Sequence, residues 1–253
     1  GEISLGTLVS LVMYIGILIW PAMALGWVTA LAQRGMASME RIQQLFDLNP
    51  EPSLKAESPG RLTGNIHVRG LTFSFNGEKP VLDDISFTVR TGDTVALVGR
   101  TGSGKSTLLG ILAGIYRAPR GTVFYDEKDI EDIPLETLRS SVAMTPQETF
   151  LFSDTIAENI SFGKAAADTY QIEDAATQAA VADEIASFPK GYESTLGERG
   201  ITVSGGQRQR IAIARALISD APILFFDDRL SNVDTMTEKT ILSNIRRRVA
   251  GKT

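Results

Sequence analysis

The first fifty residues differ from the rest of the chain in how apolar and polar positions follow one another. No charged residue occurs from Ile3 to Gln33, and about 20 apolar residues are enough for a helix to cross a bilayer. A signal peptide would have a basic start and a shorter apolar core, so the run predicts a membrane-spanning helix. A fully buried helix of a soluble protein is the alternative interpretation.

The residues on either side of this run predict its orientation. Arg34 and Arg41 follow it, whereas only Glu2 precedes it, which favours a cytoplasmic C-terminal end. Apolar residues continue at helical spacing to Phe46, so the helix is expected to extend into the cytoplasm. Pro21 lies within the span and is expected to kink or bend it. Neighbouring helices commonly satisfy the carbonyl that a proline frees, which suggests a bundle.

The pattern changes after a proline-rich, acidic stretch. Strands are expected at 66–75 and 81–89, with a turn at Asn76-Gly77 between them. Later apolar strands alternate with helical segments, which predicts an α/β domain with a mainly parallel sheet. We therefore divide the chain into a helix with its cytoplasmic extension, a linker and a folded domain: residues 1–48, 49–61 and 62–253.

Composition narrows the functional classes. The formal net charge of −5 argues against a nucleic-acid partner. The chain has no cysteine and one histidine, His67, so it offers neither a disulfide framework nor a thiolate or histidine metal site.

One motif predicts the ligand. The phosphate-loop pattern G-x-x-x-x-G-K-[ST] is met at every fixed position by Gly99-Arg100-Thr101-Gly102-Ser103-Gly104-Lys105-Ser106. The glycines let backbone N–H groups point at phosphate oxygens. Lys105 can reach the terminal phosphates, and the Ser106 hydroxyl can bind Mg²⁺. An expected strand at 94–98 precedes the loop, and an expected helix beginning at Thr107 follows it, as the motif requires.

Further segments follow in a fixed order. Ser204, Gly205, Gly206 and Gln207 open a helical run and offer a hydroxyl and free N–H groups to a second phosphate. Residues 223–227 form an apolar stretch that ends in Asp227. Pro146-Gln147 follows an expected strand at 141–144.

Together these segments resemble the motifs of ATP-binding-cassette (ABC) proteins, which implies a phosphate-loop NTPase fold with a helical subdomain. The resemblance implies that Ser204–Gln207 is the signature, which binds ATP held on a partner's phosphate loop. It implies that Asp227 is the Walker B carboxylate in the Mg²⁺ shell. Gln147 would be the Q-loop residue, contacting Mg²⁺ and the attacking water. Phe75 stands where the family usually has a tyrosine that stacks on adenine; alone, it would be assigned to the core.

The resemblance extends to both ends of the chain. Residues 1–48 look like the last transmembrane helix of an exporter half, 197–200 like the stretch that faces the membrane part, and 231–234 like a D-loop. This implies a subunit of the cell membrane with a cytoplasmic ATPase domain. The partners implied are a second half-transporter, the lipid bilayer and an exported small molecule or lipid. A switch histidine expected beyond Thr253 is absent, so we interpret the chain as a fragment.

One residue departs from the family pattern. Asp228 stands where most active members have glutamate, and its carboxylate is one methylene shorter. A displacement of about 1 Å can cost roughly 10²-fold in rate. We expect Asp228, with Gln147 and Lys105, to form a slow, ATP-retaining site in a heterodimer. There are two alternatives: the aspartate is tolerated and the hydrolysis rate is nearly normal, or the chain is a regulatory subunit that binds a nucleotide while a partner hydrolyses ATP. The charge-free run near the N-terminus argues against a third class, the soluble ATPases of the same family.

Overall fold

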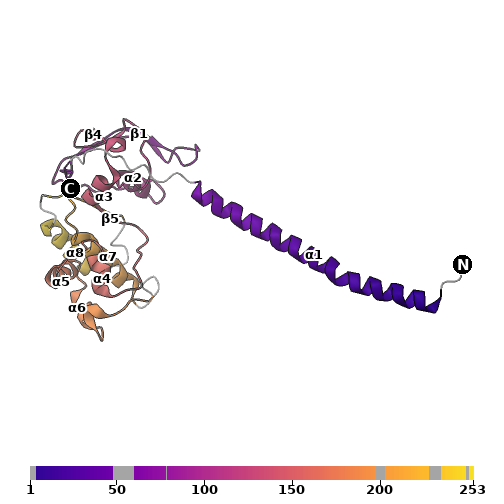
Figure 1. Cartoon of the computed structure of the whole chain (residues 1–253). Helices are drawn as coiled ribbons and strands as arrows, with labels where there is room; N and C mark the ends of the chain where they lie inside the picture. Colours follow the sequence, from indigo (N-terminus) through magenta and orange to yellow (C-terminus); the bar gives the residue numbers. More distant parts are fainter. Residues whose placement is uncertain (1–3, 48–59, 78, 198–202, 228–234, 249–250) are drawn as a thin grey trace. The chain divides into compact units, whose positions relative to one another are not determined.

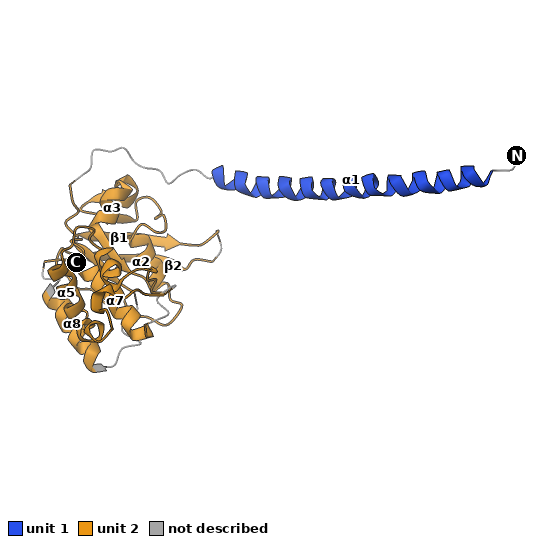
Figure 2. Cartoon of the chain, turned by 60° about the horizontal axis from the view of Figure 1, so that its bottom comes forward, with its two compact units in different colours: residues 1–52 blue, residues 53–253 orange. Residues whose placement is uncertain are grey.

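The chain forms two compact units, residues 1–52 and 53–253 (Figure 2). The computed structural model describes residues 4–47, 60–77, 79–197, 203–227, 235–248 and 251–253. Each unit is described by itself.

The first unit is one helix, α1 (Leu5–Phe46), of 42 residues, none of which is buried. Ser4 caps it, because its hydroxyl accepts a hydrogen bond from the Thr7 N–H. Its most apolar window has a mean hydropathy of 2.2, and it is the one described helix that is long and apolar enough to cross a membrane. At 1.5 Å per residue it is roughly 60 Å long, about twice the hydrocarbon thickness of a bilayer. The helix continues unbroken through Pro21 with a gentle curve (Figure 1).

The second unit begins with an antiparallel sheet. Its strands lie in the order β2 (Leu82–Val89), β1 (Ile66–Phe73), β3 (Val123–Tyr125) and β4 (Lys128–Asp129). Asn76 and Gly77 both have positive φ, 55° and 73°. Asparagine and glycine tolerate positive φ better than other residues, so the pair suits a turn in the eight-residue connection from Phe73 to Leu82. The predicted antiparallel pair is therefore confirmed: β1 ends two residues before the expected range does, β2 starts one residue after it, and the outer ends agree.

A separate two-stranded sheet is parallel. Strands β5 (Val142–Thr145) and β6 (Ile223–Phe226) pair from Val142 opposite Ile223 to Thr145 opposite Phe226. Both strands fall where the sequence predicted them. The mainly parallel sheet that we expected is represented, among the described strands, by this pair, since the larger sheet is antiparallel.

The expected strand at residues 94–98 does not form. Val98 is 94% exposed, although Leu97 packs against the core beneath it. The edge of β6 that faces away from β5 is bonded to Thr253 instead: the Leu224 N–H donates to the Thr253 carbonyl at 2.8 Å, and the Thr253 N–H donates to the Pro222 carbonyl at 2.9 Å. That edge of β6 is therefore occupied by Thr253, and residues 94–98 pair with none of the described strands.

Helices complete the unit around two hydrophobic cores. The first core contains residues of four strands, β1, β2, β3 and β6, and of two helices, α2 (Lys105–Leu112) and α3 (Leu135–Ser141). The second is helical and surrounds α7 (Gly205–Leu217), whose Ile211, Ile213 and Leu217 are fully buried. Four helices share the second core with α7: α4 (Ile156–Ser161), α5 (Thr169–Gln178), α6 (Ala182–Ala186) and α8 (Thr235–Arg248). The described residues also include two 3₁₀ turns, η1 (Ile130–Asp132) and η2 (Gly191–Glu193).

Candidate nucleotide-binding site

The phosphate loop turns on two glycines. Gly102 and Gly104 have φ of 81° and 86°, the left-handed region that strains a residue with a side chain. Gly104 is also the N-cap of α2. A Cβ on Gly104 would lie 2.8 Å from the Leu82 Cδ2 and 3.0 Å from the Val81 carbonyl oxygen, so the loop lies directly against the start of β2. The free N–H groups at the beginning of α2 form an anion site.

The Lys105 side chain lies along this loop. Its Nζ donates to the carbonyl oxygens of Gly99 at 2.9 Å and Arg100 at 3.0 Å. Phosphate oxygens carry full negative charge and make stronger hydrogen bonds with an ammonium than neutral carbonyls do. Ser106 is exposed one residue further on, in the first turn of α2, where its hydroxyl is accessible. A triphosphate could therefore reach both side chains.

Oxygen donors gather at the carboxyl end of the parallel pair. Asp227 follows β6 directly, and its side chain is buried, while its N–H donates to the Thr145 carbonyl at 3.1 Å. Gln147 follows β5 by two residues and is exposed. Because the two strands are parallel and in register, both residues leave the same edge, the usual ligand edge of α/β sheets. The structure thus places the predicted Asp227 and Gln147 at one edge of a sheet.

These donors suit Mg²⁺ rather than a transition metal. Among the described residues, no group of three or more His, Cys, Asp or Glu could hold a metal by itself. Mg²⁺ is commonly held by one or two protein oxygens, waters and substrate phosphates. A hydroxyl from Ser106, a carboxylate from Asp227 and an amide oxygen from Gln147 form such a set. The residues therefore fit Mg²⁺ that enters with a nucleotide.

The second predicted anion site is the start of α7. Ser204 and Gln207 form a capping box: the Gln207 N–H donates to the Ser204 Oγ at 3.2 Å, and the Ser204 N–H donates to the Gln207 side chain at 2.9 Å. The Ser204 hydroxyl proton is left available for a phosphate. A Cβ on Gly205 would meet no atom within 4 Å. This helix end is therefore open to an external ligand.

Phe75 lies in a group of three aromatic rings. Its ring meets those of Phe73 and Tyr116 edge-on, at centroid distances of 5.1 Å and 5.2 Å. It is 40% exposed, so part of the ring remains available for stacking. Three predicted segments lie outside the described residues: Asp228, the expected D-loop at 231–234, and Glu198 to Gly200.

Arg215 is a structural centre that the sequence analysis missed. Its Nε and Nη2 donate to the backbone and side-chain oxygens of Asn159, both at 2.8 Å, and its Nη1 donates to the Phe150 carbonyl at 2.9 Å. Its guanidinium also lies over the rings of Phe152 and Phe162. Burial lowers the pKa of Arg215. These contacts join α7 to the segment that follows Gln147. An arginine inside an otherwise apolar helical run was the available signal.

A glycine loop at a helix N-terminus, magnesium-type oxygen donors at a sheet edge and a second glycine-capped helix define the class: this is an ATP-binding domain of the phosphate-loop NTPase type. Residues 82–231 match the family described as "ABC transporter". The chain therefore belongs to the ABC transporter family, as its motifs predicted.

Relatives match over the whole chain. It is 42% identical over 255 residues to an "ATP-dependent lipid A-core flippase" of Aromatoleum aromaticum, covering 100% of this chain and 42% of that protein. It is 39% identical over 258 residues to the "Multidrug resistance-like ATP-binding protein MdlA" of Escherichia coli, covering 100% of this chain and 43% of that protein. The chain thus spans about two fifths of the length of these curated relatives.

A solved structure also matches the chain. The chain superposes on a bacterial Atm1-family ABC exporter with ATP bound with a TM-score of 0.81, at 34% sequence identity, covering 100% of this chain and 45% of that one. This confirms the predicted ABC ATPase fold preceded by a long apolar helix.

Proposed function

We propose that the chain is the ATP-binding and ATP-hydrolysing part of an ABC exporter. The observation that carries this proposal is the membrane-length helix α1 on the same polypeptide as the phosphate loop, matched along its whole length by exporter sequences. In this assignment residues 1–48 are the last transmembrane helix, 49–61 a linker and 62–253 the cytoplasmic ATPase domain of a cell-membrane protein. The names of the relatives support a lipid or another small molecule as the exported substrate.

The site residues divide the work of binding and hydrolysis. Phe75 stacks on adenine, the segment from Gly99 to Thr107 holds the phosphates, and Lys105 contacts the terminal phosphates. Ser106, Asp227 and Gln147 would hold Mg²⁺, which would neutralise charge on the phosphates when bound. Water attacks the γ-phosphate in line with the departing ADP, and positioning and charge stabilisation provide most of the catalysis. The signature of a second subunit, residues Ser204 to Gln207, closes the site.

Lys105→Ala in the full-length protein tests this function. Hydrogen bonds to charged groups contribute about 1.5–3 kcal/mol, so we expect Mg·ATP affinity to fall about 10- to 100-fold and ATPase activity to be lost. Lys190→Ala, at an exposed lysine of the same unit, is the matched control and should change neither. Unchanged ATP affinity and vesicle transport in Lys105→Ala would contradict the proposal.

Asp228 supports a finer proposal. We propose that this chain's own site hydrolyses ATP slowly and that its signature completes the faster site of a partner that carries glutamate. Asp228→Glu should then raise turnover at this chain's site, by up to about 10²-fold. The alternative is a regulatory subunit that binds ATP without hydrolysing it. Single-turnover measurements at each site of the assembled pair separate the two, and an unchanged rate in Asp228→Glu argues against the slow-site proposal.

A further inference from the structure

Tyr116 is the third ring beside Phe75, and the proposed function does not use it. The two rings meet at 5.2 Å with an interplanar angle of 84°, and Tyr116 also lies 6.1 Å from Phe73. Edge-to-face pairs of this kind have a preferred geometry. Tyr116 and Phe75 are 38% and 40% exposed. Tyr116 therefore helps to determine how the exposed face of Phe75 is presented.

Tyr116 is itself fixed to the phosphate-loop helix. The N–H groups of Ile115 and Tyr116 both donate to the Gly110 carbonyl, at 2.8 Å and 3.2 Å. A Cβ on Gly110 would lie 2.7 Å from the Tyr116 ring, so the ring packs directly on the backbone of α2. The first turn of this same helix carries Lys105 and Ser106. One helix thus holds the phosphate-binding residues at its start and Tyr116 near its end.

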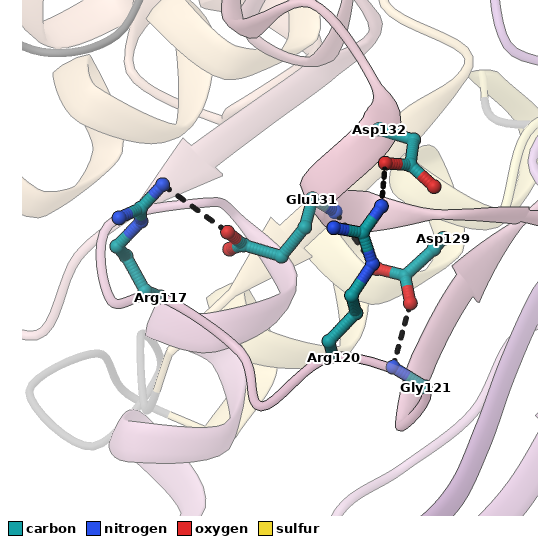
Figure 3. Close-up of polar contacts among 6 residues, drawn as sticks. All are labelled: Arg117, Arg120, Gly121, Asp129, Glu131 and Asp132. Carbon is teal, nitrogen blue, oxygen red and sulfur yellow. Dashed lines mark hydrogen bonds and ion pairs between the residues drawn. The ribbon is translucent and has the colours of Figure 1, made fainter.

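The segment after Tyr116 is held from the other side. Three contacts join it to β4 and η1 (Figure 3): Arg117 with Glu131 at 3.2 Å, Arg120 with Asp132, and the Gly121 N–H with the Asp129 carboxylate at 2.6 Å. Exposed ion pairs contribute little to stability, but these contacts define the path of the chain. Tyr116 is therefore placed by α2 before it and by this polar cluster after it.

We propose that Tyr116 is a positioning residue for the purine base of the nucleotide. It sets the Phe75 ring at a fixed place relative to α2 and so matches the base site to the phosphate site. This inference rests on the proposed function, in which Phe75 stacks on adenine. The affinity for the base then depends on the Tyr116 ring, whereas the affinity for the triphosphate does not.

The test compares Mg·ATP with Mg·tripolyphosphate, which has no base, by calorimetry on the full-length protein. We expect Tyr116→Leu to weaken Mg·ATP about 2- to 12-fold, as loss of an edge-to-face pair predicts, and to leave Mg·tripolyphosphate unchanged. Tyr116→Phe keeps the ring and should bind both like the wild type. Tyr170→Leu, at a tyrosine of α5 that is 78% exposed, is the matched control. Tyr116→Met provides a second ringless variant if the leucine variant folds poorly.

Separate outcomes overturn the inference and the proposed function. The positioning role is overturned if Tyr116→Leu weakens both ligands equally, because the loss is then structural. It is also overturned if Phe75→Leu reduces the preference for ATP and Tyr116→Leu does not. In the double variant, the Tyr116 substitution should add nothing to the effect of Phe75→Leu, and full additivity overturns the proposal. A wild-type protein that binds neither ligand refutes the proposed function instead.

Discussion

Gly163 lies where the end of α4 meets α7, and it has almost no room for a side chain. An added Cβ would lie 2.0 Å from the Arg215 carbonyl oxygen and 3.0 Å from the Ile218 Cγ2. Gly163 does not have a left-handed φ, so the cost of Gly163→Ala is steric. The substitution tests directly how closely α4 and α7 pack.

The magnitude follows from what would have to move. The Arg215 oxygen belongs to the backbone of α7, which is surrounded by the second core and bonded through the Arg215 side chain to Asn159. Relief of the contact requires a shift of more than 1 Å, roughly, since non-bonded atoms settle at about 3.5 Å or more. Overpacking of this kind costs about 2–4 kcal/mol. In a unit of this size that corresponds to a fall in melting temperature of roughly 5–15 °C.

The assay must report on the second unit. Both tryptophans, Trp20 and Trp27, lie in α1, so tryptophan fluorescence reports mainly on the first unit. Circular dichroism melts, with hydrogen exchange followed on peptides of α4 and α7, report on the contact itself. Gly60→Ala is the control, because a Cβ there meets no atom within 4 Å. If Gly163→Ala melts within about 1 °C of the wild type, the close packing of α4 on α7 is refuted.

Two further substitutions test single hydrogen bonds. Ser204→Ala removes the acceptor for the Gln207 N–H and should cost about 1 kcal/mol of stability. If Ser204 also binds a phosphate, as proposed, ATPase activity should fall as well. Ser204→Thr keeps a hydroxyl and should retain most of the stability and of the activity. Tyr125→Phe removes a buried hydroxyl that donates to the Leu112 carbonyl at 2.6 Å and should cost about 1–1.5 kcal/mol at pH 7 in chemical unfolding. Burial raises the pKa of Tyr125 above its usual 10.0, so above pH 10 only the unfolded form loses this proton and the stability of the wild type falls as the pH rises. The difference in free energy of unfolding between the wild type and Tyr125→Phe should therefore shrink above pH 10. A difference that stays constant up to pH 11 contradicts this.

Features set by neighbouring residues in the sequence could be predicted. The Asn76-Gly77 turn follows from the tolerance of these two residues for positive φ. The start of α7 follows from a serine cap with glutamine three residues later. The phosphate loop follows from the positions of Gly102 and Gly104. In each case the sequence determines the local backbone with little help from the rest of the fold.

Features set by distant partners could not be predicted. Residues 94–98 have the composition of a strand, yet strand formation requires a partner elsewhere in the fold, and they pair with none of the described strands. Gly163 has no local signal, because its need for a hydrogen side chain arises from Arg215 in a helix fifty residues away. The role of Tyr116 depends in the same way on Gly110 and Phe75.

The division of the second unit into two cores bears on how its anion sites are used. α2, which begins at the phosphate loop, packs in the first core, whereas α7, which begins at Ser204, is the centre of the second. If the start of α2 and the start of α7 of one chain bound the same nucleotide, the two separate cores would have to hold these helix ends against it. The open face at Gly205 instead leaves the start of α7 available to another molecule. The proposed sharing of nucleotides between two subunits requires such an open helix end, because each subunit would then provide one helix end to each of two sites.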